Sequence, residues 1–369
     1  MSDRHLTTLG KEVPVSDVDR ELKAFFAADE EGLTRASLMN FAIYTEAPVE
    51  EGIRNAEIIR QLTEDNACRA ILLIAQTEDA PDGRRARAWI DAHCNLGPGG
   101  EKAVCTEQVA FVLSGANTAL VNNTLFAHLD SDLPLIFWWR GELSPVFGDR
   151  LYSRIGRLLF DSRDWSSPGV SFTRLNEAME DDSADFVPHD LSYTRGNPIR
   201  RAIVNAFNDP RARQAAPTLS KVQITHGPGQ HMAALWLVAW IAERLKAELN
   251  EGASREGRFV FDRHRNFLGG TMQMLVELKE TEESVQDAAI TEVVLENDNG
   301  DAQVSVARAT TAGFWKVHIN VPGCEGTVEE LLPARLRNDA DLVAEILMRA
   351  GKNRSMLSVL PTLRAMLAL

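Results

Sequence analysis

The residues best placed to do chemistry follow an unbroken apolar run that ends at Trp139. Such a run predicts a strand covered on both faces by helices in a parallel sheet. Arg140, Gly141 and Glu142 then put a cation, a hinge and an anion at the carboxyl end of that strand, where open α/β sheets bind ligands. Interfaces are rich in Trp and Arg, so the candidate partner-binding residues are Trp138, Trp139, Arg140 and Glu142. The alternative is that both tryptophans are core residues and that the arginine closes a salt bridge.

A second group of residues could bind a phosphate or a carboxylate. Three arginines, Arg195, Arg200 and Arg201, lie close together in an acidic chain, and guanidinium groups bind oxyanions with two hydrogen bonds. The turn at residues 225–231 leads from a predicted strand into a long helix, whose N–H groups and dipole attract anions. The candidate anion-binding residues are Arg195, Arg200, Gly227, Gly229 and His231. The alternatives are surface salt bridges with the nearby acidic run and an ordinary strand-to-helix connection.

A third group is the pair Cys94 and Cys105, on two predicted strands joined by the turn at residues 97–100. Opposed residues of an antiparallel hairpin have a constant sum of indices, so a turn centred on Gly99 and Gly100 places these cysteines opposite each other. Opposed Cα atoms lie about 4.5–5.5 Å apart, at the short end of the range for a disulfide. In a reducing cytosol we expect two thiols. The alternative is a reversible bond that stiffens the hairpin and alters partner binding, which a register shift of one residue would exclude.

The common catalytic signatures are missing from the sequence. It contains no G-x-x-x-x-G-K-[ST], no G-x-S-x-G and no H-E-x-x-H motif. Its four cysteines include no C-x-x-C pair. We therefore expect no metal site and no bound cofactor.

The composition indicates a folded protein that avoids nucleic acid and membranes. Lys and Arg number 39 against 53 Asp and Glu, for a net charge of −14, which repels polyanions. No apolar run approaches the ~20 residues that cross a bilayer, and the polar N-terminus has no signal-peptide core. We expect a cytoplasmic protein without nucleic-acid or membrane partners, and leave a homo-oligomer open.

The apolar patterning divides the 369 residues into an N-terminal helical arm and two domains. Residues 1–30 form the arm. Residues 31–165 are predicted to be an α/β domain with a mixed, mostly parallel sheet flanked by helices, and turn-forming residues 166–169 mark its end. In it, strands at residues 37–44 and 68–75 with a helix from Pro48 form a β-α-β unit, and residues 87–96 and 103–113 form an antiparallel hairpin.

Residues 166–369 are predicted to be an α+β domain. A strand at residues 221–225 precedes a long core helix at 230–249, and residues 258–321 alternate apolar and polar side chains, as expected of an antiparallel meander. The Asn-Gly pair within residues 297–300 predicts a hairpin turn. Helices beginning near Asp339 and Met356 end the chain.

Six segments together resemble one family, the glucose-6-phosphate dehydrogenase assembly proteins, OpcA. They occur in the family's order along about two thirds of the chain. They are 35–44 (RASLMNFAIY), 69–73 (RAILL), 104–109 (VCTEQV), 133–141 (LPLIFWWRG), 157–162 (RLLFDS) and 190–195 (DLSYTR).

The resemblance implies a non-catalytic α/β protein that binds glucose-6-phosphate dehydrogenase and acts as its assembly factor and allosteric activator in the oxidative pentose phosphate pathway. It supplies no catalytic residues, so we do not expect an enzyme. Photosynthetic members are regulated by thioredoxin through paired cysteines near the C-terminus, whereas the C-terminal half here has only Cys324, so the resemblance does not extend to that control. The alternative function is a sugar-phosphate-binding enzyme or sensor that uses the arginine cluster and the Gly-Pro-Gly turn.

Overall fold

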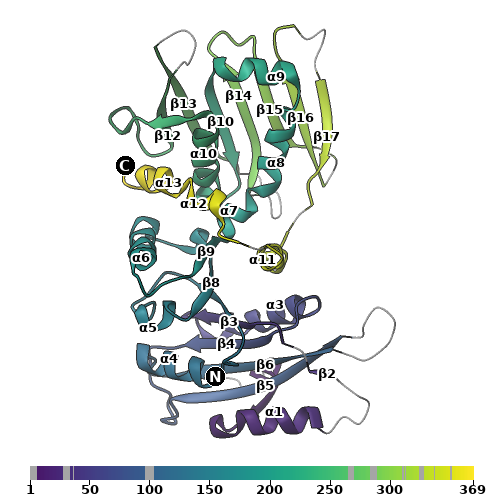
Figure 1. The fold of residues 1–369 in the computed structure, drawn as a ribbon, viewed down its shortest axis with the longest axis vertical. Coiled ribbons are helices and arrows are strands. Elements are labelled where there is room, and N and C mark those ends of the chain that lie inside the picture. Colours follow the sequence, from purple (N-terminus) through teal and green to yellow (C-terminus); the bar gives the residue numbers. More distant parts are fainter. Residues whose placement is uncertain are drawn as a thin grey trace. The chain divides into compact units, whose positions relative to one another are not determined.

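The chain forms two compact units, each built on a large sheet (Figure 1). The structure is a computed structural model and describes residues 6–27, 34–35, 37–95, 104–264, 270–282, 289–309, 311, 313–323, 328–335, 337–349 and 351–369. Unit 1 comprises Met1–His189 and Asp339–Lys352, and unit 2 comprises Asp190–Asn338 and Asn353–Leu369. This division into compact units does not test the domain boundary expected near residue 165, which stays a prediction.

The sheet of unit 1 has the strand order β1-β5-β6-β4-β3-β7-β8-β9, with β2 beside β6. Its strands are β1 (Lys11–Val13), β2 (Thr34–Arg35), β3 (Asn40–Thr45), β4 (Arg69–Ala75), β5 (Ala86–Asn95), β6 (Val104–Leu113), β7 (Leu135–Arg140), β8 (Ile155–Phe160) and β9 (Val187–Asp190). The pairs from β6 through β8 are parallel, whereas β5 runs antiparallel to both β1 and β6. The predicted mixed, mostly parallel sheet is therefore confirmed.

Helices cover the unit 1 sheet because its central strands are apolar on both sides. Every residue of β3 and β4 is buried, and so are the first five of β7, which explains why their sequences lack alternation. The helices are η1 (Leu6–Leu9), η2 (Val15–Asp17), α1 (Val18–Ala27), α2 (Val49–Gly52), α3 (Arg54–Thr63), α4 (Thr118–Ala127), α5 (Asp149–Tyr152), η3 (Ser162–Asp164), α6 (Pro168–Glu180) and α11 (Asp339–Leu347).

The segment expected as an N-terminal helical arm, residues 1–30, contains a strand as well as the helix α1. Lys11–Val13 pairs as β1 with Ala88–Ile90 of β5, and a 3-10 turn separates this strand from α1. Backbone hydrogen bonds to a neighbouring strand decide this local structure, and the amphipathic pattern of the helix could not reveal them.

The sheet of unit 2 has the order β11-β12-β13-β10-β14-β15-β16-β17. Its strands are β10 (Leu219–His226), β11 (Ala247–Leu249), β12 (Arg258–His264), β13 (Thr271–Glu280), β14 (Ile290–Asn297), β15 (Gln303–Arg308), β16 (Phe314–Asn320) and β17 (Val328–Pro333). The antiparallel meander is confirmed from β14 to β17, and Gly300 takes a φ of +74° in its first turn. It is interrupted once, because β10 lies between β13 and β14 and runs parallel to β13.

The helices of unit 2 are α7 (Leu191–Arg195), α8 (Asn197–Ala206), α9 (Pro210–Ala215), η4 (Ala216–Thr218), α10 (His231–Leu245), η5 (Glu251–Ala253), α12 (Arg354–Leu357) and α13 (Leu360–Leu367). The predicted core helix is α10, which is buried from Met232 to Ala242. It ends four residues earlier than expected because Lys246 adopts the left-handed conformation, with a φ of 51°. The next residues then pair with β12 as β11.

Asn40 ties the start of β3 to the loop that leads into β7, and we expect its loss to destabilise unit 1. The side chain is fully buried, donates to the carbonyls of Asp130 and Leu133 at 2.9 and 3.0 Å, and accepts from the Asp130 N–H at 2.9 Å. Asn40→Ala leaves these groups unsatisfied and should lower the free energy of unfolding by about 2–4 kcal/mol. Urea titration measures the change.

The control is Asn208→Ala at an exposed position, which should stay within about 0.5 kcal/mol of the unsubstituted protein. Equal stabilities for the two variants would contradict the role assigned to Asn40.

Candidate functional site

The two tryptophans at the end of β7 belong to the core of unit 1. Trp138 is 1% exposed and Trp139 is fully buried. The Trp139 Nε1–H donates to the Glu142 carbonyl at 2.8 Å, and the Trp165 indole donates to the Gly141 carbonyl at 2.9 Å. Gly141 takes a φ of +87°, which turns the chain away from the strand. The tryptophans support the rim, which we define as residues 139–142, from inside the fold. A partner could contact only the more exposed residues of the rim directly.

Arg140 closes an ion pair, as the alternative interpretation expected. Its guanidinium lies 4.8 Å from the centroid of the Trp138 ring. Nη1 donates to Asn55 Oδ1 at 3.1 Å, and Nη2 lies 3.6 Å from Asp339 Oδ2. Since the Arg140 side chain is still 24% exposed, it can meet a second group only at its solvent edge.

Glu142 is the exposed member of the rim, and it holds the start of α6. Its Oε1 accepts from the Ser167 N–H at 2.6 Å and from Ser166 Oγ at 3.1 Å. A carboxylate at a helix N-terminus satisfies an N–H group that the helix leaves unpaired. Glu142 therefore has a structural task in addition to any contact with a partner.

Acidic side chains outnumber basic ones around the rim. Arg163 lies 3.3 Å from both Asp161 and Asp164, and 3.9 Å from Asp339. Burial raises the pKa of Asp164, and the neighbouring Asp161 carboxylate raises it further. With two arginines among three carboxylates, this edge of the sheet is a network of internal ion pairs, which disfavours a free anion.

Sequence reasoning found Arg140 but missed Asn55, Arg163 and Asp339 as its neighbours. The sequence predicts only that a helix begins near Asp339. No local signal in the sequence links Asp339 to Arg140, which lies 199 positions earlier in the chain. A buried charge requires a partner, so the arginine predicted that some acid would be near it, but only the fold identified which one.

The predicted anion-binding residues lie on two different parts of unit 2 and already have partners. Arg200 is 5% exposed, donates to the Tyr193 carbonyl at 2.8 Å, and lies 3.8 Å above the Tyr193 ring. It also donates to Asn197. Arg195 ends α7 and is half-buried. The proposed anion role of these arginines stays a prediction, and the internal hydrogen bonds of Arg200 do not favour it.

The Gly-Pro-Gly turn holds a carboxylate of the chain itself. The Gly229 N–H donates to Glu280 Oε1 at 3.2 Å, so an external anion would meet a negative charge there. The rings of His226 and His231 lie 5.6 Å apart, and burial, with a further contribution from His226, lowers the pKa of His231. A neutral His231 adds no attraction for an anion.

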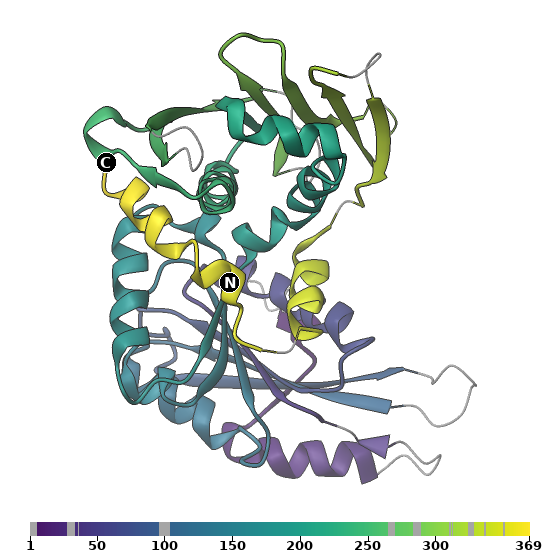
Figure 2. The same cartoon turned by 45° about the horizontal axis from the view of Figure 1, so that its top comes forward.

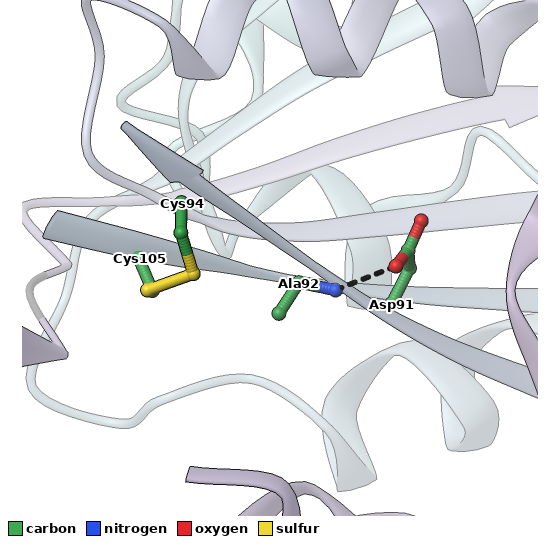
Figure 3. Close-up of a disulfide and its surroundings, with 4 residues drawn as sticks. All are labelled: Asp91, Ala92, Cys94 and Cys105. Carbon is green, nitrogen blue, oxygen red and sulfur yellow. Dashed lines mark hydrogen bonds between the residues drawn. A yellow bond between two sulfur atoms is a disulfide. The ribbon is translucent and has the colours of Figure 1, made fainter. Parts of the chain in front are cut away.

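The two cysteines of the predicted hairpin form a disulfide (Figure 3). Residues 94 and 105 are directly opposed, as the index argument predicted, and their Cα atoms are 4.0 Å apart. The expected default of two thiols therefore differs from the structure, in which the register brings both sulfur atoms to one face. Cys94 is exposed and Cys105 fully buried. The turn at residues 97–100 and Cys324 lie outside the described residues.

Metal-binding clusters and membrane-spanning helices are both missing from the described residues. Among them, no three His, Cys, Asp or Glu side chains are arranged to hold a metal ion. In the same part of the chain, no helix is long and apolar enough to cross a membrane.

Burial raises the pKa of the Cys68 thiol to about 12, so it is not a reactive nucleophile.

Two family models match the chain and together cover most of it. One is described as the N-terminal domain of a glucose-6-phosphate dehydrogenase subunit, and it matches residues 59–177. The other is described as the C-terminal domain of such a subunit, and it matches residues 187–356.

Curated relatives include cyanobacterial proteins whose names assign them, provisionally, to the OxPP cycle as OpcA. The protein of Synechocystis sp. is 25% identical over 228 residues, covering 60% of this chain and 46% of the relative. That of Nostoc punctiforme is 27% identical over 186 residues, covering 49% and 38%. The chain thus spans less than half the length of these relatives.

Solved structures resemble this chain only loosely. An oxidoreductase from Sinorhizobium meliloti aligns at a TM-score of 0.41 and 10% identity, covering 89% of each chain. A 3-ketoreductase from Actinomadura kijaniata aligns at 0.43 and 12%, covering 89% of this chain and 96% of the other. No conclusion about fold or function is drawn from likenesses this weak.

Fold and site together define an α/β protein of two sheet-based units. Its charged candidate residues Arg140, Glu142 and Arg200 contact other groups of the same chain. By its two matching domain models, the chain belongs to the OpcA family of glucose-6-phosphate dehydrogenase assembly proteins.

The disulfide predicts the number of titratable thiols. Of four cysteines, two should react in denaturant after purification without reductant, and four after reduction. Reduction should also lower stability by about 2–3 kcal/mol, because closing a short loop restricts the unfolded chain. In the Cys94→Ser, Cys105→Ser double variant, reduction should change neither the number of reactive thiols nor the stability. Four free thiols in the unreduced protein would contradict the bond.

Proposed function

We propose that the protein is a cytoplasmic, non-catalytic assembly factor and allosteric activator of glucose-6-phosphate dehydrogenase in the oxidative pentose phosphate pathway. The observation that carries the proposal is the match of both halves of the chain to domains described as those of a glucose-6-phosphate dehydrogenase subunit. The relatives' names point to the same cycle. Membership of the family supports glucose-6-phosphate dehydrogenase as the partner, and the physical arguments concern how this chain would bind it.

The geometry gives less support to the alternative, a sugar-phosphate enzyme or sensor. A phosphate site needs donors that are not already used, because the gain from binding must exceed the loss of the contacts it replaces. Arg200 donates to protein groups, and Glu280 accepts from the N–H group that a phosphate would use. Of the two functions, the assembly factor agrees better with these contacts.

The proposal predicts that the purified chain has no dehydrogenase activity of its own and raises that of its cognate enzyme. An assembly factor acts by binding, so the two proteins should co-elute. At ~1–10 μM of each protein, a complex with a micromolar Kd forms to a measurable extent. Steady-state kinetics with and without the chain, run beside size-exclusion chromatography, measure both effects. Unchanged kinetics together with separate elution would refute the proposal.

The rim of β7 predicts where the partner binds. If its exposed edge contacts the dehydrogenase, Arg140→Ala should weaken binding by about 2 kcal/mol or more, as truncation of an interfacial arginine often does. This corresponds to roughly a 30-fold change in Kd. Arg60→Ala is the matched control, because Arg60 forms an exposed ion pair with Glu57 on α3 and such pairs contribute little.

Arg140 also has structural contacts, so the melting temperature must be measured with each variant. Glu142→Gln provides a second test, since the amide oxygen can still accept from Ser166 and Ser167 while the charge is lost. Unchanged affinity in both rim variants, with the fold intact, would leave the rim with a structural role only.

The disulfide adds a regulatory proposal. Oxidation closes the β5–β6 hairpin at its end, and a stiffer hairpin would present a different surface to a partner. The oxidised and reduced proteins should then differ in affinity for the dehydrogenase, whereas the double serine variant should not respond to oxidant. Equal affinities in the two states would remove this role.

A further inference from the structure

Arg308 occupies a position of the unit 2 sheet at which the neighbouring side chains are apolar. α8 packs on one face of β15 and β16 (Figure 1 and Figure 2), and side chains reach that face at alternate positions along each strand. On β15 they are Val304, Val306 and Arg308, and both valines are fully buried. Trp315, which pairs directly with Arg308 on β16, is 3% exposed. The arginine therefore ends an apolar row and is itself half-buried.

Two contacts within unit 2 fix the orientation of the Arg308 side chain. The guanidinium carbon lies 4.4 Å from the centroid of the Trp315 ring, a favourable cation–π arrangement. Nη1 donates to the Ala334 carbonyl at 2.9 Å. Because the guanidinium is already held in one place, a ligand that binds it does not have to order a flexible side chain.

These two contacts leave donors unused. The Nε–H of Arg308 is buried without an acceptor among the described residues, and the same holds for the Nε1–H of Trp315. Burial lowers the pKa of the Arg308 guanidinium, and no carboxylate in the described part of the chain opposes this effect. Buried donors normally have partners, and a buried charge is costly unless it is paired. The missing partner is therefore an acceptor that carries negative charge.

The unused edge of the guanidinium has the geometry that oxyanions require. The internal hydrogen bond uses Nη1 and leaves the edge formed by Nε and Nη2, whose parallel N–H groups bind a carboxylate or a phosphate with two hydrogen bonds. Nε is the buried atom of this edge, so an anion would reach it through Nη2. Arg335 directly follows Ala334 in the chain and is exposed, which adds a second positive charge beside the site.

We propose that Arg308, stacked on Trp315, is the anchor of a binding site for a small oxyanion, either a phosphate or a carboxylate group, with Arg335 at its side. This site differs from the anion-binding residues expected from the sequence, because the donors of Arg200 and Gly229 are already used by groups of the chain. The proposal is independent of the assembly function, since it concerns only the chain by itself.

Thermal unfolding of the full chain, titrated with sodium phosphate and separately with sodium acetate, tests the proposal and distinguishes the two anions. Sodium chloride at matched ionic strength gives the baseline. A specific site should raise Tm with saturation and a Kd of about 1–10 mM for at least one anion. Arg308→Gln should weaken that binding at least ~10-fold, because it removes charged hydrogen bonds. Arg244→Gln is the matched control: Arg244 also lies over a tryptophan ring, at 5.7 Å, but is exposed, so the affinity should not change.

Circular dichroism shows whether the variants fold. Arg335→Gln, at an exposed position, is the second test variant and should also weaken binding, so it decides the matter if Arg308→Gln does not fold. No saturable response to either anion up to ~50 mM, well above the expected Kd, would overturn the proposal. An equal response in Arg308→Gln and the unsubstituted protein would overturn it too, as would an unchanged affinity in Arg335→Gln when that is the only variant that folds.

Discussion

The ion pair between Arg140 and Asp339 joins the end of the central strand of unit 1 to a helix from near the end of the chain. A guanidinium at the carboxyl edge of a buried strand cannot be left without a counter-charge. α11 supplies the acid from its first residue, where a carboxylate also interacts favourably with the helix dipole. At the other end of α11, Arg157 Nη1 donates to the carbonyls of Ile346 and Leu347 at 3.2 and 3.3 Å. Arginines of the first half of the chain thus hold both ends of this helix.

This arrangement explains why Asp339–Lys352 belongs to unit 1 although the residues on both sides belong to unit 2. The buried side of α11, with Leu342, Val343 and Ile346, adds apolar contact to the charged contacts at its ends. The carboxyl edge of a parallel sheet is where α/β proteins commonly bind ligands. Here that edge is occupied by groups of the chain itself, Asn55 and Asp339 around Arg140.

The two sheets use their faces differently. The central strands of unit 1 are buried on both sides, so they have little to offer a partner except at their ends. The strands of unit 2 are buried on one side and carry alternating polar residues on the other.

The sequence by itself determined the elements whose signal is local. Unbroken apolar runs identified β4 and β7, alternation identified β13 and β16, and the Asn-Gly turn and the Cys94–Cys105 register followed from hairpin geometry. Each depends on residues close together in the chain, for which period and turn chemistry suffice.

Only the tertiary structure decided the contacts between distant segments. It placed β10 between β13 and β14, paired β1 with β5, and brought Asp339 to Arg140. It also turned the candidate rim tryptophans into core residues and gave the anion-binding candidates partners within the chain. A single sequence states which side chains need burial or a counter-charge. Which of many chemically equivalent partners satisfies that need depends on how the whole chain packs.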